Sequence, residues 1–135
     1  MTLRFTRAFT ASREHIDELG HVNNAVWVQW IQDLATAHWD AAARREDHAR
    51  FLWVVVRHEI DYRGNIAAGE VAYGETFIPD APKGATSVRV VEFVDAGGKP
   101  LVSARTTWAM LDRESQRLAR VRAEIIAPFR ETPSL

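Results

Sequence analysis

The side chains best suited to chemistry lie together in residues 17–24. This short stretch supplies one carboxylate, one imidazole and two consecutive amides, from Asp17, His21, Asn23 and Asn24. It also contains Gly20, which can adopt a positive φ and so allow a tight turn. An apolar pattern typical of a helix begins directly after it. The stretch is therefore predicted to be a polar loop that runs into a helix N-terminus.

A carboxylate beside a helix N-terminus can hydrolyse an acyl group. The first N–H groups of a helix, here around Asn24 and Ala25, carry partial positive charge and can polarise a carbonyl or hold an oxyanion. Asp17 would then act either as a nucleophile on the carbonyl or as a general base on water. A thiol, with a pKa of about 8.5, departs without a strong general acid. The arrangement therefore favours a thioester as the substrate.

Hydrophobic periodicity predicts one long helix among several strands. Residues 25 to about 44 repeat with a period of 3.6, with Asn23 or Asn24 as the N-cap and Arg44 and Arg45 near the C-terminus. Residues 3–10 alternate as a strand does, and five more strands are predicted in antiparallel succession, over residues 53–63, 70–78, 85–94, 101–111 and 118–127. This order predicts an α+β fold in which a curved antiparallel sheet wraps around the helix.

Two groups of residues have a structural interpretation beside a functional one. His58 is expected to be a hydrogen-bonded core histidine, on the strand face that also carries Val54, Val56, Ile60 and Tyr62. Trp27 and Trp30 belong to the apolar stripe of the helix, and they are either core residues or walls of an acyl pocket.

The sequence resembles the hot-dog-fold thioesterases of the 4-hydroxybenzoyl-CoA thioesterase and acyl-ACP thioesterase families. The specific part of the resemblance is the pattern Asp17-x-x-Gly20-His21-Val22-Asn23-Asn24-x-x-Trp27, and the order of elements extends it over nearly the whole chain. The resemblance implies a hot-dog fold and acyl-CoA or acyl-ACP thioester hydrolysis. The hot-dog hydratase pattern, with His five residues after Asp, is not present because the gap here is four.

The resemblance also implies roles for individual residues. Asp17 matches the catalytic aspartate, the backbone N–H of Asn24 matches the group that polarises the thioester carbonyl, and His21 matches a polar active-site position. Leu19 stands where the plant acyl-ACP members have an Asn. Around these catalytic residues, the residues expected to contact substrate are Gly20, Asn23, Ala25 and Trp27.

Lys83 is the residue considered for binding the carrier of the acyl group. It precedes Gly84 at the start of a predicted strand, where it either meets the phosphates of CoA, helped by Arg89 or Arg105, or is a solvated side chain. The resemblance further implies a homodimer or a dimer-of-dimers homotetramer, with each active site at a subunit interface. A non-catalytic acyl-CoA or acyl-ACP binding or regulatory module is the alternative function, because a fold does not fix an activity.

Composition excludes several other classes of protein. The 135 residues are expected to form a single domain, residues 1–135, and the chain has no cysteine, so thiolate chemistry is absent. With 17 basic and 18 acidic residues the net charge is −1, which offers no basic stripe for nucleic acid. We expect no signal segment and no membrane partner, and we expect a cytoplasmic location. No metal or cofactor is expected, because the spacing of His15, Asp17 and His21 fits no zinc signature.

Overall fold

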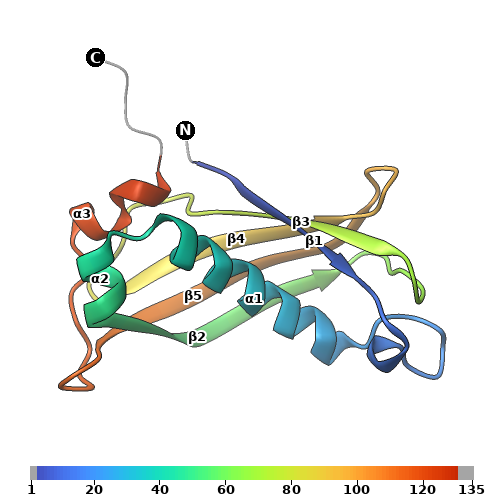
Figure 1. Cartoon of the computed structure of the whole chain (residues 1–135), viewed down its shortest axis with the longest axis horizontal. Helices are drawn as coiled ribbons and strands as arrows, with labels where there is room; N and C mark the ends of the chain where they lie inside the picture. The colour runs from blue at the N-terminus through green and yellow to red at the C-terminus, as the bar shows by residue number, and fades with distance from the viewer. Residues whose placement is uncertain (1–2, 131–135) are drawn as a thin grey trace, which may run out of the picture.

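The computed structural model of the chain describes residues 3–130. Five antiparallel strands form one sheet in the order β1-β3-β4-β5-β2, and the long helix α1 (Asn24–Ala42) lies across one of its faces (Figure 1). The strands are β1 (Phe5–Thr10), β2 (Phe51–Tyr62), β3 (Val71–Phe77), β4 (Thr86–Val94) and β5 (Pro100–Asp112). The predicted α+β architecture, one helix enclosed by a sheet, is therefore confirmed.

Helix α1 begins where the sequence predicts and ends slightly earlier. Asn23 is the N-cap, and its side-chain oxygen accepts the N–H of Ala25 at 2.9 Å. The helix ends at Ala42 rather than near residue 44, because the backbone is extended at Ala43 and Arg44, and Arg44 forms an ion pair with the buried Asp47 at 2.8 Å. This ion pair stabilises a second, short helix, α2 (Arg45–Arg50), which is too polar to give an apolar periodicity.

A β-bulge in β2 changes the face that was expected to be buried. The pairing of β2 with β5 shifts by one residue between Val55 and Arg57. Odd-numbered residues therefore face the helix before the bulge, and even-numbered residues face it after the bulge. Val54 and Val56 are therefore exposed rather than buried, at 40% and 61%. His58 is half-buried and its Nδ1 lies 2.8 Å from the hydroxyl of Thr106, as expected for a hydrogen-bonded histidine.

The strand order corrects the predicted antiparallel succession. β2 pairs with β5 at one side of the sheet, whereas β3 pairs with β1 and β4, so β2 and β3 are not neighbours. The connection between them crosses from one side of the sheet to the other and passes beneath the start of α1, where Asn65 bonds to Val22. Within the described residues, the outer edge of β2 has no strand beside it.

Residues 118–127 were predicted to be a strand, and this prediction is wrong. They make a single bridge, from Leu118 to Leu111, and then turn into a short helix α3 (Ala123–Ile126) and a 3₁₀ turn η2 (Ala127–Phe129). The buried apolar residues do not alternate as those of a strand would: Ile125 lies four positions after Val121, Ile126 follows directly, and Phe129 lies four and three positions after these two. That spacing places them on one side of a helical turn, which closes one end of the sheet.

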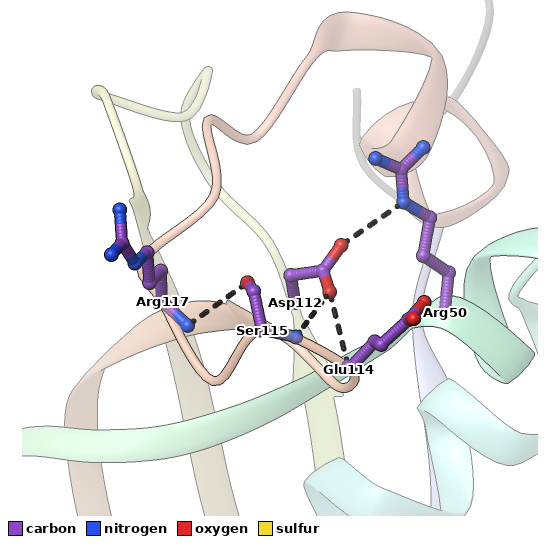
Figure 2. Close-up of polar contacts among 5 residues, drawn as sticks. All are labelled: Arg50, Asp112, Glu114, Ser115 and Arg117. Carbon is purple, nitrogen blue, oxygen red and sulfur yellow. Dashed lines mark hydrogen bonds and ion pairs between the residues drawn. The ribbon is translucent and has the colours of Figure 1, made fainter.

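The turn after β5 directs the chain into this closing segment. Oδ1 of Asp112 accepts the N–H groups of Glu114 and Ser115, each at 3.0 Å, and Oδ2 accepts Nε of Arg50 at 3.2 Å (Figure 2). The hydrogen bond from Ser115 and the contact with Arg50 hold the pKa of the Asp112 carboxyl below its usual range. Asp112 thereby joins the end of β5 to α2.

The buried apolar residues form two clusters, one at each end of α1. The cluster near the helix N-terminus contains Trp27, Trp30 and Phe93, and there the sheet approaches closely at Gly74. A Cβ on Gly74 would lie 2.7 Å from Phe93 and 2.8 Å from Leu34, so a larger residue would have to displace these buried side chains. The second cluster, which includes Phe51 and Phe129, lies at the other end under α2 and α3.

Candidate active site

The loop of residues 12–23, here called the Asp17 loop, is closed by its own backbone hydrogen bonds. The N–H of Asp17 donates to the carbonyl of His21 at 2.8 Å, and the N–H of Gly20 donates to the carbonyl of Asp17 at 3.1 Å. Gly20 has a φ of 77°, which disfavours any residue with a side chain. Ile16 and Val22 are bridged across the base of this turn. The polar stretch is therefore an ordered turn.

The Asp17 carboxylate is oriented by this turn. Its Oδ1 accepts the backbone N–H groups of Leu19 at 2.9 Å and His21 at 3.2 Å. Within residues 3–130 its Oδ2 accepts no hydrogen bond, and the side chain is half-buried. One oxygen thus fixes the carboxylate while the other stays free for a water or a carbonyl carbon.

The loop is attached to the start of α1 on two sides. The N–H of Asn23 donates to the carbonyl of His15 at 2.9 Å, which joins the two ends of the loop. The side chain of Asn65, from the connection between β2 and β3, accepts the N–H of Val22 at 3.0 Å and donates to its carbonyl at 3.1 Å. The position of the carboxylate relative to the helix is fixed by these contacts.

The first backbone N–H groups of α1 differ in whether they are already bonded. Ala25 donates to the Asn23 side chain, and the N–H groups of Val26 and Trp27 reach the Asn23 carbonyl at 2.9 and 3.3 Å. The N–H of Asn24 has no acceptor in the part of the chain that the structure describes. The amide matched to the carbonyl-polarising group is thus the one left available, whereas Ala25 is satisfied by the N-cap.

The other residues expected around Asp17 lie in different environments. Gly20, His21, Asn23 and Asn24 are exposed on the loop and the helix start. Trp27 is fully buried, at 0% exposure, and packs against Trp30 and Phe93, so the structure places it in the core rather than at a pocket wall of this chain.

Lys83 lies at the opposite end of the sheet from the Asp17 loop. Lys83 is exposed and bridges to Thr86 at the start of β4. Thr86 pairs with Ala109 of β5, which in turn pairs with Val54 near the N-terminal end of β2. Arg89, considered beside it as a phosphate ligand, is only 7% exposed and faces the interior. Within one chain, therefore, neither side chain comes together with Asp17.

A cavity that the sequence did not predict lies at the C-terminal end of α1. This end of the helix is the one opposite the Asp17 loop (Figure 1). Its volume is about 240 Å³, and seven elements contribute to its wall: α1, α2, β2, β4, β5, α3 and η2. Arg89 and Ser87 of β4 line it together with several aromatic side chains. The alternation of β4 marks Arg89 as facing inward with Val91 and Phe93, which was the one available signal.

Residues 3–130 contain neither a membrane-spanning helix nor a metal-binding cluster. Among these residues no helix is long and apolar enough to cross a membrane. The same residues contain no group of three or more His, Cys, Asp or Glu side chains that could hold a metal ion.

Comparison with known families identifies the class of protein. The family model described as the acyl-ACP thioesterase N-terminal domain matches residues 2–129. The chain therefore belongs to the acyl-ACP thioesterase family, and the resemblance carried by the residues from Asp17 to Trp27 is confirmed at the level of the family. No curated protein sequence matches the chain.

Solved structures with the same fold include proteins of several activities. A hypothetical protein of Staphylococcus aureus, solved in complex with CoA, is 12% identical and aligns over 100% of this chain and 90% of its own, with a TM-score of 0.83. A 1,4-dihydroxy-2-naphthoyl-CoA thioesterase from Synechocystis is 15% identical over 93% of this chain and 94% of its own, with a TM-score of 0.77.

A third structure, an acyl-ACP thioesterase from Bacteroides thetaiotaomicron, is 20% identical over 96% of this chain, with a TM-score of 0.80. This chain covers only 54% of that protein. These likenesses, all with low sequence identity, establish that the α+β architecture is the hot-dog fold.

Proposed function

We propose that this chain hydrolyses acyl thioesters of CoA or acyl carrier protein at the Asp17 loop. The observation that carries the proposal is the unbonded N–H of Asn24 at the start of a 19-residue helix, next to a loop that holds a carboxylate with one free oxygen. Membership of a thioesterase family supports the same reaction. The likeness to a structure solved with CoA supports a carrier of that kind.

In the proposed mechanism the thioester carbonyl docks on the N–H of Asn24. This N–H and the helix dipole stabilise the negative charge that develops on the carbonyl oxygen. Asp17 then either removes a proton from an attacking water or attacks the carbonyl carbon to form a mixed anhydride, which water hydrolyses. The sulfur leaves as a thiolate, whose pKa of about 8.5 makes a general acid unnecessary. The exposed imidazole of His21 is proposed to contact the substrate beside this carbonyl.

We further propose that the active unit is at least a dimer, formed by antiparallel pairing of β2 with its copy. The outer edge of β2 carries unpaired backbone groups over a 12-residue strand and exposes Val54 and Val56. Two-fold symmetric pairing of two protomers along this edge would bury Val54 and Val56. Such a dimer could pair again into a tetramer.

Antiparallel pairing would bring opposite ends of two chains together. The N-terminal end of β2 lines the cavity through Phe51 and Trp53, whereas its C-terminal end leads to Asn65, which contacts the Asp17 loop. In the dimer, the cavity of one protomer would therefore lie beside the Asp17 loop of its partner. Trp53 and the exposed Lys83 would then belong to the partner's substrate site.

The test is thiol release from short, long and aromatic acyl-CoAs and from acyl carrier protein thioesters. Asp17→Asn keeps the Oδ1 that accepts the Leu19 and His21 N–H groups, so the turn is retained while the base or nucleophile is lost. We expect kcat to fall by about 10²- to 10⁴-fold for every substrate. Glu18→Gln removes the neighbouring exposed carboxylate and serves as the matched control, with kcat unchanged.

Two results would contradict the proposal. Equal rates for the natural chain and Asp17→Asn would remove Asp17 from the mechanism. Tight binding of acyl-CoA without release of thiol from any substrate would instead identify a non-catalytic binding module. If hydrolysis is seen, a single turnover in ¹⁸O-labelled water separates the two roles of Asp17, because only the nucleophilic route leaves label in its carboxylate.

A further inference from the structure

The cavity at the C-terminal end of α1 contains a charged side chain that the proposed reaction does not use. Five of its fifteen lining residues are Phe or Trp, and the residues that the argument uses are Arg89, Ser87, Trp53, Trp108 and Phe129. Its volume of about 240 Å³ accommodates roughly eight to ten non-hydrogen atoms. It is therefore large enough for a small acyl or aromatic group and has an unusual charge within it. We call it the Arg89 cavity.

Arg89 is held in place by neutral partners. Its Nη1 donates to Nδ1 of His38 at 2.8 Å and to the hydroxyl of Thr76 at 3.2 Å, and its guanidinium lies 5.8 Å from the ring centre of Phe129. Burial, reinforced by the charge of Arg89, lowers the pKa of His38 to about 4, so this histidine is neutral near pH 7. Arg89 keeps its charge there, because burial lowers its pKa only to about 10.

No carboxylate balances this charge. Within residues 3–130, Arg89 forms no ion pair with Asp or Glu, although the side chain is only 7% exposed. A buried charge without a counter-ion is costly, and buried arginines are normally paired. At the rim of the cavity, the carboxylate of Asp40 is bonded to His48 at 2.8 Å, and Arg113 adds another positive charge. The electrostatic environment therefore favours an anion.

The free N–H groups of Arg89 have the geometry that a carboxylate needs. The two hydrogens of Nη1 are used by His38 and Thr76, whereas Nε and Nη2 donate to no atom of the described residues. These two nitrogens form one edge of the planar guanidinium, which matches the two oxygens of a carboxylate. Arg89 lines the cavity, so this edge is the donor pair that a ligand would find.

Other polar atoms of the wall also lack partners. The hydroxyl of Ser87 and the indole N–H groups of Trp53 and Trp108 are buried and bonded to nothing within the described residues. Unsatisfied buried polar groups are rare in proteins, and three in one wall beside an unpaired guanidinium indicate a site for a ligand rich in acceptors.

We propose that the Arg89 cavity binds the carboxylate of a small apolar acid. Nε and Nη2 of Arg89 donate hydrogen bonds to the two carboxylate oxygens, and the aromatic side chains of the wall pack against the apolar part of the acid. The acid is either the far end of an acyl group that carries a second carboxylate, or a free acid. The first source rests on the proposed function. In that case the cavity selects the substrate for the Asp17 loop of the partner protomer.

The distance within one chain supports a site shared between two chains. Thr36, at the cavity, is twelve residues beyond Asn24, which corresponds to about 18 Å along the helix. The closely packed residues Ile31 and Leu34, both 0% exposed, lie on the helix between the two ends. A small acyl group cannot span that distance, whereas the cavity of a β2-paired partner would lie much closer.

The first experiment measures binding to the full chain by calorimetry at pH 7.5. Phenylacetate and phenylacetamide have the same size and shape and differ in charge. We expect phenylacetate to bind at least tenfold more tightly. Equal affinities for the two would overturn the proposal, and this comparison needs no variant.

The second experiment locates the effect at Arg89. Arg89→Met replaces the guanidinium by an apolar chain of similar length, and circular dichroism checks its fold. We expect the preference for phenylacetate to fall below twofold. Arg105→Met removes an arginine that is 54% exposed on the neighbouring strand β5, and it should keep the preference. A folded Arg89→Met that still prefers the acid tenfold would contradict the proposal.

The third experiment identifies the source of the carboxylate. Adipoyl-CoA and hexanoyl-CoA have the same chain length, and only adipoyl-CoA ends in a carboxylate. A kcat/KM at least tenfold higher for adipoyl-CoA, lost in Arg89→Met, assigns the cavity to the acyl group. Equal hydrolysis of both, with phenylacetate still bound, assigns it to a free acid. If neither thioester is hydrolysed but phenylacetate binds, the proposed function fails while the cavity proposal stands.

Discussion

The two ends of α1 differ in how their functional groups are assembled. At the N-terminal end, Asp17 comes from the Asp17 loop and Asn24 is the helix residue that directly follows this loop, and backbone hydrogen bonds within the loop orient the carboxylate. At the C-terminal end, Arg89, His38 and Thr76 come from three different elements and meet only in the folded chain. The first end is exposed and polar, and the second is buried and aromatic.

This difference separates two tasks. A carboxylate beside an unbonded amide suits a chemical step that is the same for every acyl group. A cavity with a fixed charge suits recognition, because an incorrect ligand would leave the charge unpaired. Changes at the N-terminal end should therefore alter turnover of all substrates alike, whereas changes at the C-terminal end should alter the choice among them.

Apart from the loss of Asp17 itself, the largest effect should follow from separating the two protomers of the proposed dimer. Val56 is 61% exposed on the unpaired edge of β2, so Val56→Lys places a charge in the proposed interface. We expect a shift from dimer to monomer in analytical ultracentrifugation and a loss of more than tenfold in kcat/KM.

Tyr73→Lys provides the control for this change. Tyr73 is 46% exposed, but its strand β3 is paired on both sides, so a lysine there should leave the dimer intact. A dimeric and fully active Val56→Lys would show that the two ends do not meet through β2.

A smaller effect concerns the neutral histidine behind Arg89. The pKa of His38 falls from its ordinary 6.5 to about 4 in the folded chain, so the unfolded chain takes up the proton first as the pH drops. The associated stability is complete above pH 6.5 and is lost as the pH falls toward 4. Allowing for solvent screening, we expect a loss of about 2 kcal/mol in the free energy of unfolding.

Urea denaturation at pH 7.5 and pH 4.5 measures this loss against His38→Gln. The glutamine oxygen can still accept from Arg89 but does not titrate. The natural chain should lose about 2 kcal/mol more than the variant over this interval. The same loss in both would mean that His38 is not the titrating group.

The smallest effect tests the loop at the N-terminal end. Asn23→Ala removes the side chain that caps Ala25 and should lower the free energy of unfolding by about 1 kcal/mol. The side chain of Asn24 makes no hydrogen bond within residues 3–130, so Asn24→Ala should change stability by much less. Thermal unfolding of the pair checks this, and equal losses would contradict the assigned cap.

The same difference explains what the sequence can predict. The long helix, its N-cap at Asn23 and four of the five strands predicted after it follow from local periodicity, and the local phrase around Asp17 is enough for the family. The strand order depends on the path of the β2–β3 connection, and the bulge in β2 reverses which residues face inward. Neither is encoded in a local pattern.

The Arg89 cavity shows most clearly what the sequence alone does not predict. An arginine on a strand normally indicates a solvated face. The alternation of β4 groups Arg89 with Val91 and Phe93, but only the fold shows that it lies beside His38. The closing segment was also misread, because its apolar residues, such as Val121 and Ile125, are ordered by packing over the end of the sheet rather than by strand pairing.

The central claim is that a complete site combines the Asp17 loop of one protomer with the Arg89 cavity of the other. Differently tagged Asp17→Asn and Arg89→Met chains can be co-expressed and the mixed dimer purified. In that dimer one site carries both defects and the other carries neither. We predict that it hydrolyses adipoyl-CoA at about half the rate of the natural dimer. A rate no higher than the mean of the two variant homodimers would contradict the shared site.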